Sequence, residues 1–166
     1  GARGGIPPTL PLPTHGESTF GLRPFVTVYD AIGDLVNRPG PGSEYTPEVR
    51  RWFELVPPGG NWRDLPKALQ REALGDRSYD AGGGKTGFYR RLHWDRPAPT
   101  ITGRANRKGS ALCHPTATRP LSVHECARLQ GFPDTWKIQG SSAQQYQQIG
   151  NAVPTHLGAA IARVLS

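Results

Sequence analysis

Glycine and proline interrupt this chain so often that its regular elements have to be short. The 166 residues include 21 glycines and 17 prolines, whereas hydrophobic residues make up only 36% of the sequence. Proline removes a backbone donor and glycine relaxes the backbone, so segments rich in both favour turns and loops. We therefore expect one loop-rich domain, or a small domain with a docking segment, that carries an irregular functional surface or buries apolar surface against a partner.

Short helices are predicted wherever a capping residue precedes an apolar stripe. Thr27 with Asp30, and Ser122 with Glu125, have the spacing of a capping box. Thr46 stands before a proline, as caps do when proline occupies the first helical position. Together with three further apolar stripes, these signals predict helices over 27–35, 46–56, 67–74, 122–130, 142–149 and 155–164.

The strand signals lie in the middle of the chain. Residues 88–94 and 98–102 are rich in aromatic and β-branched side chains and are separated by a turn at 95–97. They predict a hairpin-like pair of short strands between two loops, at 82–87 and 104–115. The sequence therefore predicts an α+β fold with a small, irregular β region.

The net positive charge is confined to one segment. Residues 82–119 contain eight basic side chains and one acid, Asp95, which gives a net charge of +7. The whole chain also carries +7, so the remaining residues are neutral in sum. Basic residues interleaved with glycine and aromatic residues are typical of a surface that binds nucleic-acid phosphates. A solvated basic face without a ligand is the alternative interpretation.

The sequence carries no signal for a membrane or for secretion. No apolar run approaches the roughly 18 residues that span a bilayer, and residues 1–5 lack the apolar core of a signal peptide. Cys113 and Cys126 are too few for a disulfide framework and suit a reducing compartment. We expect a cytoplasmic protein with no membrane partner. Since the chain contains no methionine, its amino terminus is expected to have been processed or cut from something longer.

Four potential metal ligands lie near one another in the sequence, namely Cys113, His114, His124 and Cys126. Their spacing matches none of the usual paired zinc-ligand patterns. Cys126 also falls on the apolar side of its predicted helix. We therefore predict no metal site.

Two segments resemble sequence motifs of a known family. Residues 119–134 read Arg-Pro-Leu-Ser-Val-His-Glu-Cys-Ala-Arg-Leu-Gln-Gly-Phe-Pro-Asp, and residues 148–154 read Gln-Ile-Gly-Asn-Ala-Val-Pro. In this order, with a short gap between them, they resemble the ninth and tenth motifs of the 5-cytosine DNA methyltransferases. Further stretches resemble the linker and target-recognition region of that family, so that the resemblance covers essentially the whole chain; they are 12–15, 30–35, 56–66, 87–94 and 98–102.

The first eight motifs of the family have no counterpart in the sequence. There is no Phe-x-Gly-x-Gly loop, no Glu-Asn-Val and no Gln-x-Arg-x-Arg, and neither Cys113 nor Cys126 follows a proline as the family's nucleophile does. The resemblance therefore implies the DNA-recognition half, a subunit or a fragment, of a DNA cytosine-5 methyltransferase that is inactive alone. The implied partners are double-stranded DNA and a catalytic half, which would share the cofactor S-adenosylmethionine with this chain.

The same resemblance implies a prokaryotic restriction-modification setting, with the protein at the nucleoid through DNA. A standalone DNA-binding module without enzymatic activity is the alternative, and a decayed fragment is a weaker one. A segment resembling the tenth motif separates these readings, because a free-standing DNA reader has no need of a cofactor-pocket segment.

The resemblance implies DNA contacts within the basic segment. Threonines on a strand suit phosphate contacts, arginine pairs bidentately with guanine, and an aromatic ring can stack on a base or belong to the core. Lys85, Arg90 and Arg91 match the family's first recognition loop, and Arg104, Arg107 and Lys108 match the second. The predicted DNA-binding residues are Lys85, Tyr89, Arg90, Arg91, Thr100, Thr102, Arg104, Arg107 and Lys108.

The last two motifs imply structural and cofactor roles. Arg119, Glu125 and Arg128 are expected to organise the recognition region through the cap and charge-assisted hydrogen bonds. Asn151 and Ala152 are expected to complete the S-adenosylmethionine pocket, with backbone N–H groups free at a helix start. The predicted organisation is an extended lead-in (1–24), a target-recognition domain (25–118), and helices (119–166) that dock on an α/β Rossmann-like catalytic domain absent from this chain.

Overall fold

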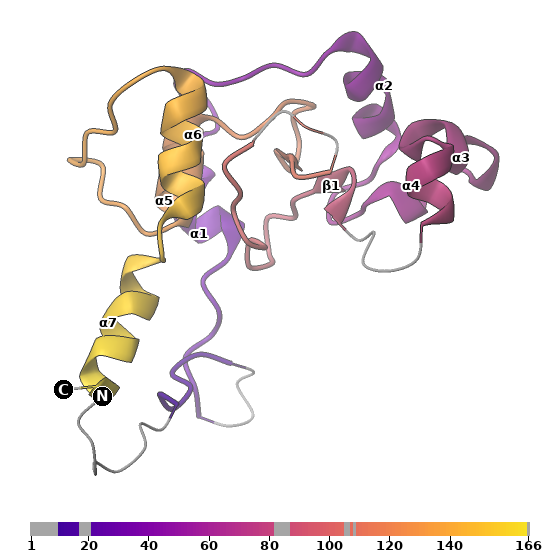
Figure 1. The fold of residues 1–166 in the computed structure, drawn as a ribbon. Coiled ribbons are helices and arrows are strands. Elements are labelled where there is room, and N and C mark those ends of the chain that lie inside the picture. The colour runs from indigo at the N-terminus through magenta and orange to yellow at the C-terminus, as the bar shows by residue number, and fades with distance from the viewer. Residues whose placement is uncertain (1–9, 17–20, 82–86, 105–106, 108, 166) are drawn as a thin grey trace.

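The computed structural model describes residues 10–16, 21–81, 87–104, 107 and 109–165. Its helices and strands form a broad body, from which the last helix and the N-terminal segment project together (Figure 1). The described elements are α1 (Val28–Ile32), η2 (Gly33–Leu35), α2 (Pro47–Leu55), η3 (Trp62–Asp64), α3 (Lys67–Leu74), α4 (Asp76–Asp80), β1 (Arg90–Arg91), β2 (Leu112–Cys113), α5 (Val123–Leu129), α6 (Ser142–Asn151) and α7 (Thr155–Leu165).

The helix starts follow the capping signals of the sequence. Thr27 caps α1 in a capping box with Asp30, Thr46 caps α2 before its N-terminal proline, and Ser122 caps α5 in a box with Glu125. The predicted cap of α6 is wrong by one residue, because Ser141 is the cap. Helix α4 was not predicted; it directly follows Gly75, at which the predicted helix ends.

The sheet differs from the predicted hairpin. β1 pairs in parallel with β2, which lies in the segment predicted to be a loop, while residues 98–102 form no strand. Pro97 and Pro99 lack the N–H groups that a ladder requires. The carbonyls of Trp94 and Arg96 are instead satisfied by the backbone N–H groups of α1, at 3.0 and 2.9 Å. The described part of the fold is therefore α+β with a two-stranded parallel sheet.

Two apolar clusters hold the body together. The first joins α1, α5 and α6 through buried residues that include Ile32, Leu121 and Ile149. The second packs α2 and α3 around Phe53 and Leu74. Ile101 and Leu112 precede the predicted domain boundary at 118 and lie in the first cluster together with residues that follow that boundary. Residues on the two sides of the predicted boundary therefore share one core.

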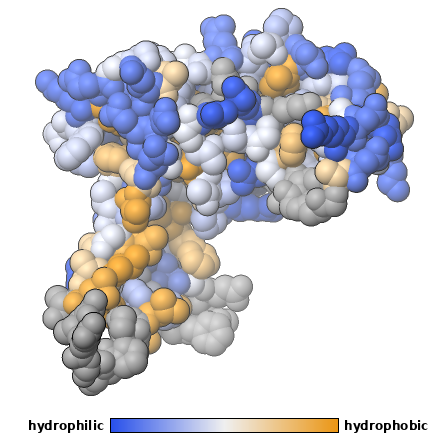
Figure 2. All heavy atoms as spheres, viewed as in Figure 1, coloured by the Kyte–Doolittle hydropathy of each residue, from blue (hydrophilic) through white to orange (hydrophobic). Residues whose placement is uncertain are grey.

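The projecting part of the molecule exposes apolar side chains. Helix α7 buries none of its described residues, and Leu157, Ile161 and Leu165 are 51%, 41% and 66% exposed. Leu10 and Leu12 in the N-terminal segment are also exposed. In Figure 2 hydrophobic residues, drawn in orange, gather over the projection, whereas hydrophilic residues cover most of the body. None of the helices in the described residues has the length and hydropathy to cross a membrane.

Candidate nucleic-acid interface

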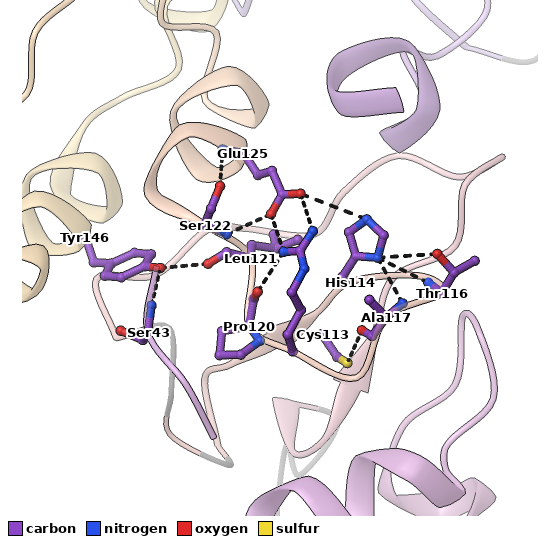
Figure 3. A network of polar contacts seen from close by, with 11 residues as sticks. Ser43, Cys113, His114, Thr116, Ala117, Pro120, Leu121, Ser122, Glu125 and Tyr146 are labelled. Carbon is purple, nitrogen blue, oxygen red and sulfur yellow. Dashed lines mark hydrogen bonds and ion pairs between the residues drawn. The ribbon is translucent and has the colours of Figure 1, made fainter. Parts of the chain in front are cut away.

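A buried ion pair joins the chain after β2 to helix α5. Glu125 is fully buried in α5, and its two oxygens accept hydrogen bonds from the Arg119 guanidinium at 2.7 and 2.8 Å. The Ser122 N–H donates to the same carboxylate at 2.7 Å (Figure 3). This pairing raises the pKa of Arg119. A bidentate pair closed by a capping box holds the chain after β2 against the start of α5.

His114 lies beside this pair in the neutral form. Its Nδ1 accepts from the backbone N–H groups of Thr116 and Ala117, at 3.3 and 3.1 Å, so Nδ1 carries no proton. Its Nε2 is 3.9 Å from the Glu125 carboxylate. The Trp94 ring packs against the imidazole in a T-shaped arrangement. Burial, reinforced by the charge of Arg119, lowers the pKa of His114 to about 4. The network in Figure 3 therefore contains one cation and one anion at neutral pH.

Tyr146 ties α6 to the same network. Its hydroxyl donates to the Leu121 carbonyl at 2.8 Å and accepts from the Ser43 N–H at 3.1 Å. The side chain is buried, and its two hydrogen bonds join three segments that are distant in sequence. The arrangement places one face of α6 at the edge of the basic segment.

A polar hollow opens between the basic segment and α6. Its volume is about 580 Å³, and residues from the basic segment form one wall, residues from α6 another; they are Thr102, Gly103, Arg104, Arg107, Ser110, Ala143, Tyr146, Gln147 and Asn151, together with Ser43. Thr102 Oγ1 donates to the Ser110 carbonyl at 3.2 Å, and Ser110 Oγ donates to the Arg104 carbonyl at 2.8 Å. These bonds shape the loop and leave both guanidinium groups exposed.

A second basic hollow is lined in part by β1. Its volume is about 270 Å³, and its lining includes Arg90, His93 and Arg96 with the glycine turn at 59–60. Arg90 is half-buried, and burial lowers the pKa of its guanidinium. Its Nε is buried without a hydrogen-bond partner in the described part of the structure. A cation in that position gains an interaction partner when a phosphate enters.

The exposed or half-buried arginines that line the two hollows have no ion pair with a carboxylate, unlike five arginines elsewhere in the described residues. Arg50, Arg51, Arg71, Arg119 and Arg128 each pair with a carboxylate. Among the described residues, no carboxylate lies within ion-pair distance of Arg90, Arg96, Arg104 or Arg107. Positive charge without an internal counter-ion is what a phosphate-binding surface requires.

Two of the predicted DNA-binding residues are buried in the protein. Arg91 is 7% exposed, and its guanidinium donates to the carbonyls of Phe53, His114 and Pro115 and to Thr118 Oγ1. Tyr89 is 1% exposed and donates to the Ala73 carbonyl at 3.1 Å. Neither side chain can reach DNA without leaving these partners, so we revise both to structural roles. The sequence offers no local signal for this, because Arg91 carries the same charge as Arg90, and Tyr89 precedes the strand in a left-handed backbone conformation.

The remaining predicted residues are placed as follows. Thr100 is exposed, and Thr102 is half-buried and lines the larger hollow together with Arg104 and Arg107. Lys85 and Lys108 lie outside the described residues. Arg128 joins α5 to η2 by donating to Asp34, and it also donates to Asp134. Hydrogen bonds from Arg128 and His124 hold the pKa of Asp134 well below its usual range.

The predicted cofactor segment lies at the end of a helix, which corrects one expectation. Gly150 and Asn151 belong to the last turn of α6, and the Ala152 N–H donates to the Ile149 carbonyl. Their N–H groups are therefore not free at a helix start. What the segment offers is the exposed Asn151 side chain, which lines the larger hollow. Sequence reasoning also missed Gln130, whose buried amide donates to the carbonyls of Ile149 and Ala152 at 2.9 and 3.4 Å.

The two thiols of the chain are unsuited to nucleophilic attack. Cys113 and Cys126 are both buried. Burial raises the pKa of Cys126 to about 12 and also raises that of Cys113, so both remain protonated at neutral pH. No group of three or more potential metal ligands occurs within the described ranges. The chemistry that the described surface supports is the binding of phosphates and polar base edges.

Comparison with known proteins places these features in a family. A family model described as C-5 cytosine-specific DNA methylase matches residues 32–166. The chain is 45% identical over 143 residues to the type II methyltransferase M.Eco47II of Escherichia coli, covering 83% of this chain and 34% of that protein. It is 46% identical over 121 residues to the type II methyltransferase M.Sau96I of Staphylococcus aureus, covering 73% and 28%.

Similarity extends to a plant protein. DNA (cytosine-5)-methyltransferase 3 of Arabidopsis thaliana is 34% identical over an alignment of 185 residues, which covers 90% of this chain and 13% of that protein. The chain thus spans about a third of the length of the bacterial relatives.

Proposed function

Since this chain belongs to the C-5 cytosine-specific DNA methylase family, we propose that it is the DNA-recognition part of an S-adenosylmethionine-dependent DNA cytosine-5 methyltransferase. The observation that carries the proposal is a set of four exposed or half-buried arginines at the two hollows that have no carboxylate partner among the described residues. The larger hollow is also lined by a helix whose end resembles the family's tenth motif. A basic surface of this kind binds duplex DNA through its phosphates.

The two hollows divide the work of holding DNA. Arg104 and Arg107, with Thr102, present charge and a hydroxyl at the larger hollow and suit phosphates. Arg90 and Arg96 contribute the second contact region. Methylation at C5 requires the target cytosine to leave the base stack, so phosphates on both sides of the extruded nucleotide have to be held. Two separate cationic hollows meet that requirement.

The end of α6 is the part of this chain that would face the cofactor. The Asn151 side chain is exposed and its amide offers both a donor and an acceptor, which fits the edge of a polar ligand such as S-adenosylmethionine. When bound, that cofactor supplies the methyl group. The residues of this chain would orient the cofactor. They would not supply the nucleophile, because the two cysteines are buried and protonated.

The apolar projection is the proposed docking surface for the catalytic part. Leu157, Ile161 and Leu165 of α7 and Leu12 of the N-terminal segment expose side chains that a domain of the family's catalytic type would cover. Exposed apolar patches on such a scale mark interaction surfaces. The catalytic part would supply the nucleophile, and this chain would supply the grip on DNA.

The DNA-binding half of the proposal is tested by the salt dependence of affinity for a fluorescent duplex. Each lost phosphate contact lowers the slope of log K against log salt by about 0.9. Replacing both Arg104 and Arg107 by alanine should therefore lower the slope by about two. Arg50→Ala, which removes an arginine paired with Glu54 outside the basic segment, is the matched control and should leave the slope unchanged. An unchanged slope in the double variant, or no binding by the unaltered chain, would overturn the proposal.

A further inference from the structure

Helix α6 crosses the basic segment at a contact that leaves no room for a side chain. A Cβ atom built on Gly150 would lie 2.2 Å from the Gly103 nitrogen and 2.5 Å from the Thr102 carbonyl carbon. Both obstacles are backbone atoms, which cannot move aside as the end of a flexible side chain can. The last turn of α6 therefore rests directly on the main chain of the segment that leads into the larger hollow.

The contact is matched from the opposite side. A Cβ atom on Gly103 would lie 2.9 Å from the Cα of Gln147, which is one helical turn before Gly150. Residues three apart on a helix share a face, so Gln147 and Gly150 form one surface against Thr102 and Gly103. Two glycines, one from each segment, thus allow the backbones to meet.

Space, rather than backbone freedom, explains the glycine at position 150. Gly150 lies inside α6, where the backbone conformation is open to any L-residue. Glycine within a helix is unfavourable compared with alanine. Its presence here is explained by the crossing alone, because an alanine methyl group would occupy the position of the Gly103 backbone.

The other side of the same turn is also held. The buried Gln130 amide donates to the carbonyls of Ile149 and Ala152, so the ninth-motif helix grips the end of α6. The turn that carries Gly150 and Asn151 is therefore clamped between α5 and the Thr102–Gly103 backbone. Displacement of one partner has to move the other.

We propose that Gly150 is a positioning residue that sets the register between the backbone of residues 102–104 and the cofactor-facing end of α6. The inference rests on the proposed function for what the two sides bind, and on the crossing itself for their coupling. Through this contact, Arg104, which directly follows Gly103, is held beside Asn151 at the larger hollow. A ligand that orders one wall of the hollow thereby orders the other.

The test compares Gly150→Ala with Gly158→Ala, a control in α7 where an added Cβ meets nothing within 4 Å. Amide hydrogen exchange reports the order of residues 102–104, and the salt dependence of duplex binding reports the phosphate contacts that remain. Gly150→Ala should speed exchange in 102–104 and in the last turn of α6, while exchange in α2 and α3 stays as in the unaltered chain. Duplex affinity should fall about tenfold, as for one lost contact, with a lower salt slope. Gly158→Ala should change none of these.

The outcomes separate the two proposals. Unchanged exchange in 102–104 of a folded Gly150→Ala chain overturns the positioning role, whether or not the chain binds DNA. Failure of the unaltered chain to bind DNA overturns the proposed function, while the exchange measurement still decides the positioning role. If Gly150→Ala does not fold, Gly103→Ala makes a milder clash from the loop side, and it should loosen the end of α6; if it does not, the proposal is wrong.

Discussion

Replacement of Arg119 by alanine should remove a large part of the stability of this chain. Glu125 is fully buried, whereas the Arg119 side chain is 27% exposed, so the two partners are not equivalent. Arg119→Ala removes both hydrogen bonds that the guanidinium donates to Glu125. It leaves the buried carboxylate with only the Ser122 N–H as a close donor. Breaking one partner of a buried pair costs about 3–5 kcal/mol, a large fraction of the roughly 5–15 kcal/mol by which domains are stable.

Replacement of the other partner, Glu125, should destabilise the fold less. Glu125→Gln removes the buried charge and keeps an oxygen that can accept one bond, while Arg119 retains access to water. We expect a loss of about 1–3 kcal/mol. Arg50→Ala provides the surface reference, because its pair with Glu54 is more than half exposed on both sides and is worth about 0.3–0.5 kcal/mol.

Urea unfolding followed by circular dichroism measures all three variants on one scale. The expected order of destabilisation is Arg119→Ala, then Glu125→Gln, then Arg50→Ala. A loss below about 1 kcal/mol for Arg119→Ala would place that variant in the range of a surface pair. That result, or a larger loss for Glu125→Gln than for Arg119→Ala, would refute the reasoning that the buried carboxylate dominates.

Further predictions concern His114, Arg91 and Arg90. The pKa of His114 is lowered to about 4, against 6.5 when unfolded, so its contribution is complete above pH 6.5 and is lost as the pH falls toward 4. His114→Asn, whose side-chain oxygen can replace Nδ1 as acceptor, should remove about 3 kcal/mol of that pH dependence in urea titrations; an unaltered pH profile would contradict the buried neutral form. Arg91→Ala should lower the free energy of unfolding by about 2–4 kcal/mol, because it strands buried carbonyls. Arg90→Ala should leave that free energy unchanged and weaken duplex binding; the opposite pattern would reverse the assignment of the two arginines.

The local features of the fold could be predicted because they depend on near neighbours in sequence. The capping boxes at Thr27 and Ser122 and the proline start of α2 are complete within four residues, and the structure confirms them. The family resemblance was also readable from contiguous motifs, and the match over residues 32–166 confirms it. Such signals survive without knowledge of the tertiary structure.

The features that sequence reasoning missed depend on long-range contacts. The pairing of β1 with β2 joins residues about twenty positions apart across a loop, and two prolines removed the hairpin that composition favoured. Arg91 carries the same charge as Arg90, and only the packing of Phe53 and His114 around it makes it structural. The crossing of Gly150 over Gly103 has no sequence signal at all, since a glycine near a helix end usually indicates a cap.

Methyl transfer tests the central claim most directly. The chain would be combined with the complementary catalytic region of a relative such as M.Eco47II, and transfer of tritiated methyl groups from S-adenosylmethionine to duplex DNA would be measured. We predict transfer from the mixture and none from either part alone. A chain that binds DNA but never restores transfer with a folded catalytic region would be a standalone DNA-binding module, and transfer by the chain alone would contradict the division of labour proposed here.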